Sequence, residues 1–165
     1  MGQKNSNPQP GDLIEIFRRG YRHWALYMGD GYVIHVTDEG IVISTDGITS
    51  TFSGKATVKK ELLTEVAGNA KWRVNNKYDR RHVPFSVEEI IQRAESCVGR
   101  EVEFSVLNNN CEHFVTELRY GVRLSDQVRN VVFRTVVAAE TFLLSHMATA
   151  VVKSFSSNSS KERNC

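Results

Sequence analysis

Short apolar runs separated by polar turns occupy most of the first two thirds of the chain, a pattern typical of β-strands. Many of the runs are rich in valine, isoleucine and aromatic residues, which favour strands. Strands are predicted at 13–17, 24–28, 32–36, 41–44, 56–63, 72–74 and 102–107. The run at 56–63 also fits a helix, and we interpret it as a strand. The polar stretches 46–54 and 75–82 predict loops.

One helix is predicted after Pro84, where Ser86 and Glu89 have the spacing of a capping box. Gly99 can end this helix. Its apolar positions recur at helical spacing and predict a buried stripe made of Val87, Ile90, Ile91, Ala94 and Val98.

A second helix is predicted at Cys111, because asparagines directly before an apolar-periodic stretch are N-cap signals. Cys111, Phe114, Val115 and Leu118 recur at i, i+3, i+4 and i+7, and Gly121 can end the helix. Together the predicted elements indicate an α+β domain, with an antiparallel sheet packed by helices on one side.

Composition excludes several classes of protein. The 165 residues and the formal net charge of +2 fit one domain with tails, and argue against a dedicated nucleic-acid binder. The three cysteines, at 97, 111 and 165, contain no CxxC pair, so neither a disulfide framework nor a zinc site is predicted. The first twelve residues are polar and lack a secretory pattern, so we expect a reducing, cytoplasmic environment.

Cys111 is the candidate nucleophile. In the first turn of a helix, the positive end of the helix dipole is expected to lower the pKa of a thiol. N–H groups of that turn lack helical partners and can stabilise an oxyanion. Cys97, by contrast, follows the apolar stripe of its own helix and is predicted to be a core residue.

Five histidines could serve this thiol as a base. Two residues along a helix is a rotation of about 200°, so His113 is expected to point away from Cys111. His82 belongs to a charged loop and is expected to be solvated, and His146 belongs to the C-terminal segment. His23 and His35 remain, on the two strands of one predicted hairpin.

The register of that hairpin decides whether His23 and His35 can act together. A two-residue turn at 30–31 would pair Leu26 with His35, and His23 would then face the other side. A three-residue loop at 29–31 would pair Ala25 with His35 and place both imidazoles on one face, about 7 Å apart on the diagonal. We predict the second register.

A nucleophilic mechanism follows from this arrangement. His23 accepts the proton of Cys111 or holds the thiolate as an ion pair, and His35 orients and polarises His23. A thioester acyl-enzyme forms, and water or an amine resolves it.

Five segments resemble the HRAS-like suppressor family, the phospholipase A and acyltransferase enzymes related to lecithin–retinol acyltransferase. They are 11–17, 21–27, 29–35, 73–77 and the block Asn110-Cys111-Glu112-His113-Phe114-Val115. The resemblance covers about residues 8–125.

The resemblance implies a circularly permuted papain-like fold and a Cys-His-His triad, carried here by Cys111, His23 and His35. It implies a calcium-independent phospholipase A1/A2 that moves an acyl chain from a glycerophospholipid such as phosphatidylcholine. The acceptor is water, the amine of phosphatidylethanolamine or a lysophospholipid. No metal or organic cofactor is implied. The loop at 37–51 is short for the family, which bears on substrate entry.

The C-terminal part carries the candidate membrane attachment. The segment 128–153 is apolar but interrupted by Arg129, Arg134, Glu140 and His146, so it can be a weak anchor, a surface-lying helix or an ordinary packed helix. We take the membrane-associating interpretation. Gly2 with Ser6 also fits an N-myristoylation pattern.

The expected organisation is therefore a flexible lead-in at 1–10, a catalytic domain at 11–125, the membrane segment at 128–153 and a disordered tail at 154–165. Two other functions remain open: a papain-like thiol peptidase or isopeptidase, and a non-enzymatic membrane adaptor. A lipid enzyme needs apolar surface leading to the thiol, and Phe17, Trp24 and Tyr32 are candidates for it.

Overall fold

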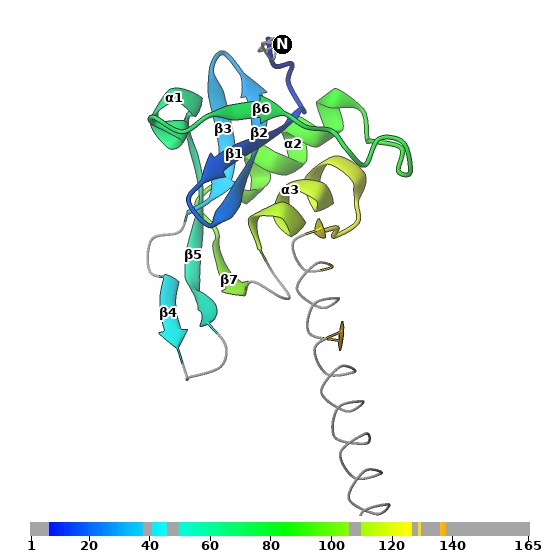
Figure 1. The fold of residues 1–165 in the computed structure, drawn as a ribbon. Helices are drawn as coiled ribbons and strands as arrows, with labels where there is room; N and C mark the ends of the chain where they lie inside the picture. The colour runs from blue at the N-terminus through cyan, green and yellow to red at the C-terminus, as the bar shows by residue number, and fades with distance from the viewer. Residues whose placement is uncertain are drawn as a thin grey trace, which may run out of the picture. The chain divides into compact units, whose positions relative to one another are not determined.

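The computed structural model describes residues 7–37, 41–45, 50–105, 110–126, 129, 136 and 137, and it forms an α+β fold (Figure 1). Seven strands and three helices follow one another along this part of the chain. In order they are β1 (Leu13–Arg18), β2 (Tyr21–Gly29), β3 (Tyr32–Val36), β4 (Ile41–Thr45), β5 (Ser50–Leu62), α1 (Leu63–Ala67), β6 (Trp72–Val74), α2 (Val87–Cys97), β7 (Glu101–Ser105) and α3 (Cys111–Tyr120).

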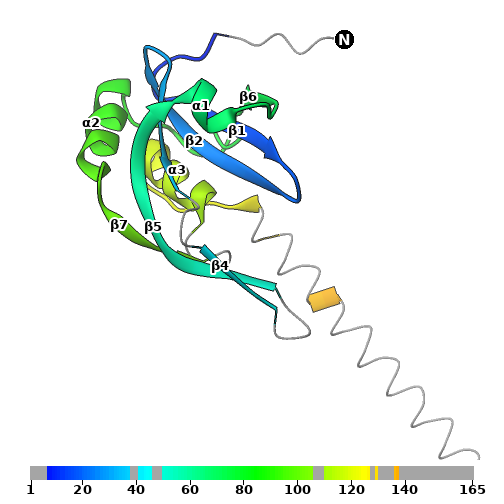
Figure 2. The same ribbon diagram turned by 90° about the vertical axis from the view of Figure 1, so that its left-hand side faces the viewer.

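The strands form one antiparallel sheet in the order β4-β5-β3-β2-β1-β6, and β7 pairs with β5 beside this path. β5 is the longest strand, and Figure 2 shows it as a curved ribbon that runs from β4 to α1. Its first part pairs with β4 and β7, and its last part pairs with β3. The end of β5 therefore lies next to the predicted histidine hairpin.

All seven predicted strands are present, but the loop predicted at 46–54 is wrong from Ser50 onward, where β5 begins. Serine, threonine and glycine in this stretch suggest a loop when only local propensity is considered. Pairing with β4 and β7 satisfies the backbone and makes it a strand. Residues 46–49 lie outside the described part.

Each face of the sheet carries its own apolar cluster, so the expectation of helices on one side is wrong. On one face α2 and α3 pack against Trp24, Leu26 and Ile34. On the other face Leu63 and Ala67 of α1 pack against a second set, formed by Ile14, Ile16, Ala25 and Val33. A five-residue helix is too short to produce a recognisable period, which is why α1 was not predicted.

The stripe predicted for α2 is only partly right. Ser86 caps the helix, since its Oγ accepts the N–H of Glu89 at 3.3 Å. Ile90 and Ala94 are buried, but Val87 and Val98 are largely exposed because they stand at the two ends of the helix. Cys97, predicted as core, is partly buried against the larger cluster.

The chain divides into two compact units, Met1–Ser125 and Asp126–Cys165. In the second unit Asp126 pairs with Arg129 at 3.2 Å. Apart from residues 129, 136 and 137, the predicted segment 128–153 lies outside the described part, as does Gly2. Within the described part, no helix has the length and apolar character needed to cross a bilayer.

Candidate active site

The N-terminus of α3 is held by a reciprocal cap. The Oδ1 of Asn110 accepts the N–H groups of Glu112 at 3.0 Å and His113 at 3.1 Å. In return, the Nδ1 of His113 accepts the N–H of Asn110 at 3.3 Å. Burial, followed by the charge of Arg123, lowers the pKa of His113, so its ring is neutral and can accept this bond. His113 is thus a capping residue, in keeping with its exclusion as the base.

The thiol of Cys111 lies at an edge of β2. Its Sγ donates to the carbonyl oxygen of Arg22 at 3.6 Å, and the N–H of Trp24 also faces the sulfur. β3 pairs with β2 only from Ala25 onward. The thiol therefore contacts the part of β2 before Ala25, where β3 is not paired with it. The two backbone groups that contact the sulfur belong to the residues on either side of His23.

Burial raises the pKa of Cys111 to about 12, so the predicted lowering is wrong for the resting protein. Loss of water around the sulfur is the largest cause, and the negative charge of Glu112 adds to it. The N–H groups of Trp24, Glu112 and Cys111 act in the opposite direction but do not compensate. Desolvation therefore outweighs the helix terminus here, and the resting thiol is protonated.

The predicted register of the histidine hairpin is confirmed, although the loop that produces it is different. Ala25 pairs with His35, as a three-residue loop would require. The actual turn has two residues, Asp30 and Gly31, with φ of 53° and 84°, and the pairing shifts between Tyr27 and Gly29. Positive φ at both positions is characteristic of a tight type I′ turn, and the bulge supplies the extra residue that restores the register.

His23 and His35 contact each other directly. The Nε2 of His23 lies 3.0 Å from the Nδ1 of His35, and the two rings meet edge to face at 84°. Both side chains are buried. The sheet therefore brings the two predicted imidazoles together within one hydrogen bond.

Sequence reasoning missed Glu61. Its Oε2 lies 2.6 Å from the Nε2 of His35. His35 pairs with Lys59 of β5, so Glu61 is two residues along on the same face. Nothing in the sequence identifies β5 as the neighbour of β3, and for this reason no local signal pointed to Glu61.

A buried ion pair beside the candidate nucleophile Cys111 was also missed. Glu112 is fully buried, and its carboxylate contacts Lys77 at 2.6 Å, Ser125 at 2.7 Å and Tyr78 at 3.1 Å. The Nζ of Lys77 lies 4.9 Å from the ring centroid of Trp24. Lys77 thus ties the segment after β6 to the first turn of α3. The position of Lys77 in the segment 73–77, which resembles the family, was the sequence signal that could have identified it.

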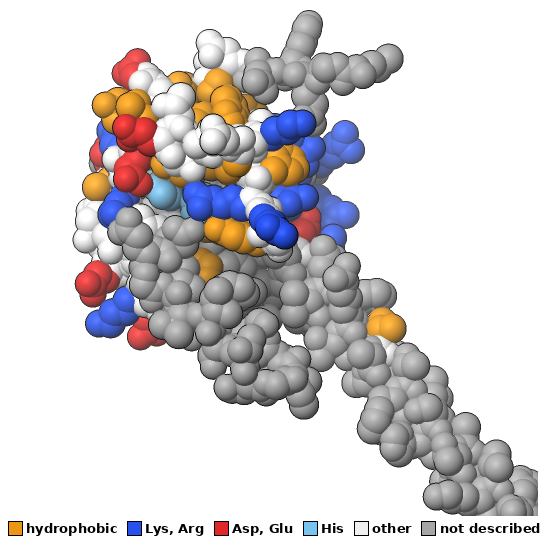
Figure 3. Space-filling model, turned by 60° about the vertical axis from the view of Figure 1, so that its left-hand side comes forward, with side chains coloured by type: hydrophobic (Ala, Val, Ile, Leu, Met, Phe, Trp, Pro, Cys, Tyr) orange, Lys and Arg blue, Asp and Glu red, His pale blue; other side chains and the backbone are white. Residues whose placement is uncertain are grey.

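The three candidate apolar positions are dispersed. Trp24 is buried in the cluster that α2 and α3 cover, and Tyr32 is exposed at the start of β3. Phe17 lies between two cations, with Arg22 at 4.6 Å and Arg73 at 5.3 Å from its ring centroid. Figure 3 shows lysine and arginine side chains gathered on a face where histidine is also visible. Acidic side chains lie on the other side of the same histidine, so the described surface near it carries both kinds of charge.

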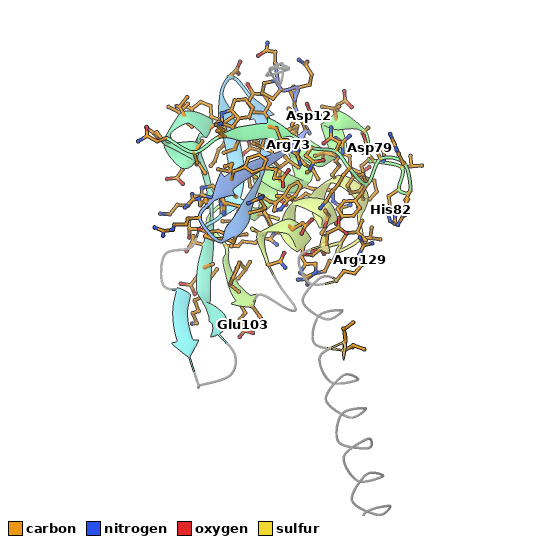
Figure 4. All side chains as sticks on the ribbon, in the orientation of Figure 1. Asp12, Arg73, Asp79, His82, Glu103 and Arg129 are labelled. Carbon is orange, nitrogen blue, oxygen red and sulfur yellow. The ribbon has the colours of Figure 1, made fainter. Side chains whose placement is uncertain are left out.

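The loop at 75–82 supports α3 from its other end. Asp79, which is labelled in Figure 4, accepts from Arg119 at 2.9 Å and from the hydroxyl of Tyr120 at 2.6 Å. Arg119 in turn donates to the carbonyl oxygen of Gly11 at 2.8 Å. His82 is partly exposed, and its ring lies 6.1 Å from that of Tyr120. Among the described residues, no His, Cys, Asp and Glu side chains are grouped as metal ligands.

Comparison with known proteins gives consistent matches over this region. A family model described as lecithin retinol acyltransferase matches residues 6–124. The Homo sapiens protein phospholipase A and acyltransferase 1 is 55% identical over 127 residues, which cover 76% of each chain. Phospholipase A and acyltransferase 3 of Homo sapiens is 54% identical over 133 residues, 79% of this chain and 82% of that protein. Phospholipase A and acyltransferase 4 of Homo sapiens is 44% identical over 146 residues, 87% and 89% of the two chains.

Proposed function

The chain belongs to the lecithin retinol acyltransferase family, and from this we propose that it is a phospholipase A and acyltransferase. It moves an acyl chain from a glycerophospholipid to water, to the amine of phosphatidylethanolamine or to a lysophospholipid. The names of its relatives support the substrate class. The observation that carries the proposal is the His23–His35 contact at 3.0 Å, made beside the strand edge that holds the sulfur of Cys111.

Cys111 is the nucleophile and His23 is its general base. The raised pKa of Cys111 favours proton transfer during attack over a thiolate–imidazolium pair that exists beforehand. The thiol proton passes to His23 as the sulfur attacks the ester carbonyl. The lysophospholipid then leaves with that proton, and a thioester remains on Cys111.

The developing oxyanion needs a donor at the start of α3. The N–H groups of Glu112, His113 and Phe114 donate to Asn110. We assign the role to the N–H of Cys111, the first residue of the helix. In the second half of the reaction His23 removes a proton from water or from the acceptor, which then attacks the thioester.

The reaction uses side chains and backbone alone, so the proposal includes no metal or organic cofactor. The segment 128–153 brings the catalytic domain at 11–125 to a membrane surface, where both lipid substrates are present. N-myristoylation of Gly2 would add a second attachment. The enzyme is accordingly placed in the cytoplasm and on membranes.

The test is incubation of the full chain with vesicles of phosphatidylcholine, labelled in the acyl chains, and phosphatidylethanolamine, with a calcium chelator present. We expect labelled fatty acid and labelled N-acyl-phosphatidylethanolamine. C111S should abolish both products, whereas C97S, which removes a partly buried thiol on α2, should retain them. Folded, vesicle-bound protein that forms no labelled product would reject the proposal. Cleavage of peptide thiol-protease substrates by that same protein would favour the peptidase alternative.

A further inference from the structure

Three side chains on the three adjacent strands β2, β3 and β5 form a single line of polar contacts. The Nε2 of His23 meets the Nδ1 of His35 at 3.0 Å, and the Nε2 of His35 meets the carboxylate of Glu61 at 2.6 Å. His35 thus uses a different ring nitrogen for each of its two neighbours. Two neutral imidazoles in series have only two arrangements of their protons, and the group at the end of the line selects between them.

The carboxylate sets the direction of these hydrogen bonds. A carboxylate can only accept, so the Nε2 of His35 must carry the proton and donate it to Glu61. In neutral His35 the Nδ1 is then unprotonated and accepts from the Nε2–H of His23. This leaves the Nδ1 of neutral His23 unprotonated, as a general base requires.

We propose that Glu61 is a positioning residue that fixes both histidines in the Nε2–H form and thereby keeps the Nδ1 of His23 available to the thiol of Cys111. This inference rests on the proposed function for its catalytic meaning. Glu61 itself touches neither the thiol nor a substrate; it acts through His35.

The charge of Glu61 also matters during the reaction. The proton of the Cys111 thiol moves to the Nδ1 of His23, which becomes an imidazolium that still donates to His35. The negative charge of Glu61, one ring away, stabilises this cation until the proton passes to the leaving group. Without an acceptor at position 61, His35 can carry its proton on Nδ1. His23 would then accept with Nε2 and hold its own proton on Nδ1, and the base would be lost.

Besides Glu61, other groups that can carry a charge lie on the elements around His23 and His35. Lys59 of β5 is paired opposite His35 and is the cation nearest to it in register. Arg22 of β2 adjoins His23 in sequence and contacts Glu15 at 3.5 Å. From α3, Cys111 lies at the edge of β2 with its thiol protonated. Among the described residues, Glu61 is therefore the acid that contacts the histidine pair, and its side chain is 39% exposed, so water reduces its influence.

The direct test is ¹⁵N NMR of the histidine side chains in the full-length protein at neutral pH. We expect Nε2–H for both His23 and His35 in the wild type. In E61A we expect the two rings to populate the Nδ1–H forms. E95Q is the matched control, because Glu95 is a comparably exposed glutamate that pairs with Lys60 of the same strand. It should leave both tautomers unchanged.

Activity measurements give the second readout. A wrong tautomer beside a triad histidine costs about 10⁴-fold in kcat where the acid is buried. Because Glu61 is partly exposed and one ring further away, we expect kcat/KM to fall about 100-fold in E61A and about tenfold in E61Q. Loss of the negative charge should also move the acid limb of the kcat/KM profile to lower pH by about half a unit in E61Q. E95Q should change neither quantity.

The outcomes separate the two proposals. Nδ1–H in wild-type His35, or unchanged tautomers and pH profile in folded E61A, would overturn the role of Glu61 even if the enzyme is active. Wild-type protein with the expected tautomers but no acyl transfer would instead reject the proposed function. Equal thermal unfolding of E61Q and E95Q would exclude a merely structural explanation of a shifted pH profile.

Discussion

The two halves of the candidate site are specified by the sequence in different ways. At the start of α3 the cap, the proposed nucleophile and the first turn lie within a few consecutive residues, from Asn110 onward. The histidine side joins residues 12 and 26 positions apart, on three strands of the sheet. The first half depends on local capping chemistry, and the second depends on strand register. An error of one residue would leave the first half intact and destroy the second.

Insertion of one glycine between Trp24 and Ala25 should have the largest effect, because it keeps the pair Ala25–His35 and turns His23 to the opposite face. We expect acyl transfer to fall to the background rate, measured with labelled phosphatidylcholine. Deletion of Met28 is the control, since it removes only the unpaired bulge residue: Tyr27 still pairs with Val33 and Ala25 with His35, so this variant should stay active. Full activity of the insertion variant would show that the register is not the determinant.

Replacement of single histidines by alanine compares the two halves of the candidate site directly. His23→Ala should lower kcat by about 10²- to 10⁴-fold, because it removes the proposed general base. His113→Ala removes only a cap and should lower the free energy of unfolding by about 1 kcal/mol, with little change in kcat per folded molecule. Steady-state kinetics and urea denaturation measure the two quantities. A kcat as low in His113→Ala as in His23→Ala would mean that the base has been misassigned.

The ion pair between Lys77 and Glu112 should affect stability more than chemistry. Lys77→Met leaves a fully buried carboxylate without this partner, and we expect the free energy of unfolding to fall by about 3 kcal/mol. Lys55→Met is the control, since Lys55 and Glu101 form an exposed pair at 3.9 Å, and its effect should be below about 0.5 kcal/mol. Equal urea midpoints for the two variants would contradict the importance of the buried pair.

The raised pKa of Cys111 predicts a change in stability at alkaline pH. Between pH 9 and about 12 the thiol ionises in the unfolded chain, whose pKa is near 9.0, but stays protonated in the folded one. The unfolded state then binds fewer protons, so stability decreases as pH rises through this window. C111S should have a shallower decrease in urea midpoint from pH 9 to 11. Tyr120, whose pKa is raised mainly by burial, adds to the slope in both proteins. Identical slopes would contradict a protonated resting thiol.

The difference between local capping chemistry and strand register also explains which features could be predicted from the sequence. Local patterns predict the cap at Asn110, the helix from Cys111 that Gly121 ends, and β6, and the structure contains all of them. The contact between His23 and His35 was predicted through the right register but the wrong loop, because a bulge cannot be read from alternation alone. Glu61 and the partner of Lys77 depend on which distant segments become neighbours, and no local pattern carries that information. The pKa of Cys111 was predicted in the wrong direction, since the degree of burial at the strand edge was unknown.

The most direct test of Cys111 as the nucleophile is the mass of the protein quenched in acid during turnover of phosphatidylcholine. We expect one added acyl chain on the peptide that contains Cys111, removable by neutral hydroxylamine, and no added chain in C111S or His23→Ala. Product formation at the full rate with no acylated intermediate, or an acyl chain on Cys97 in place of Cys111, would contradict it.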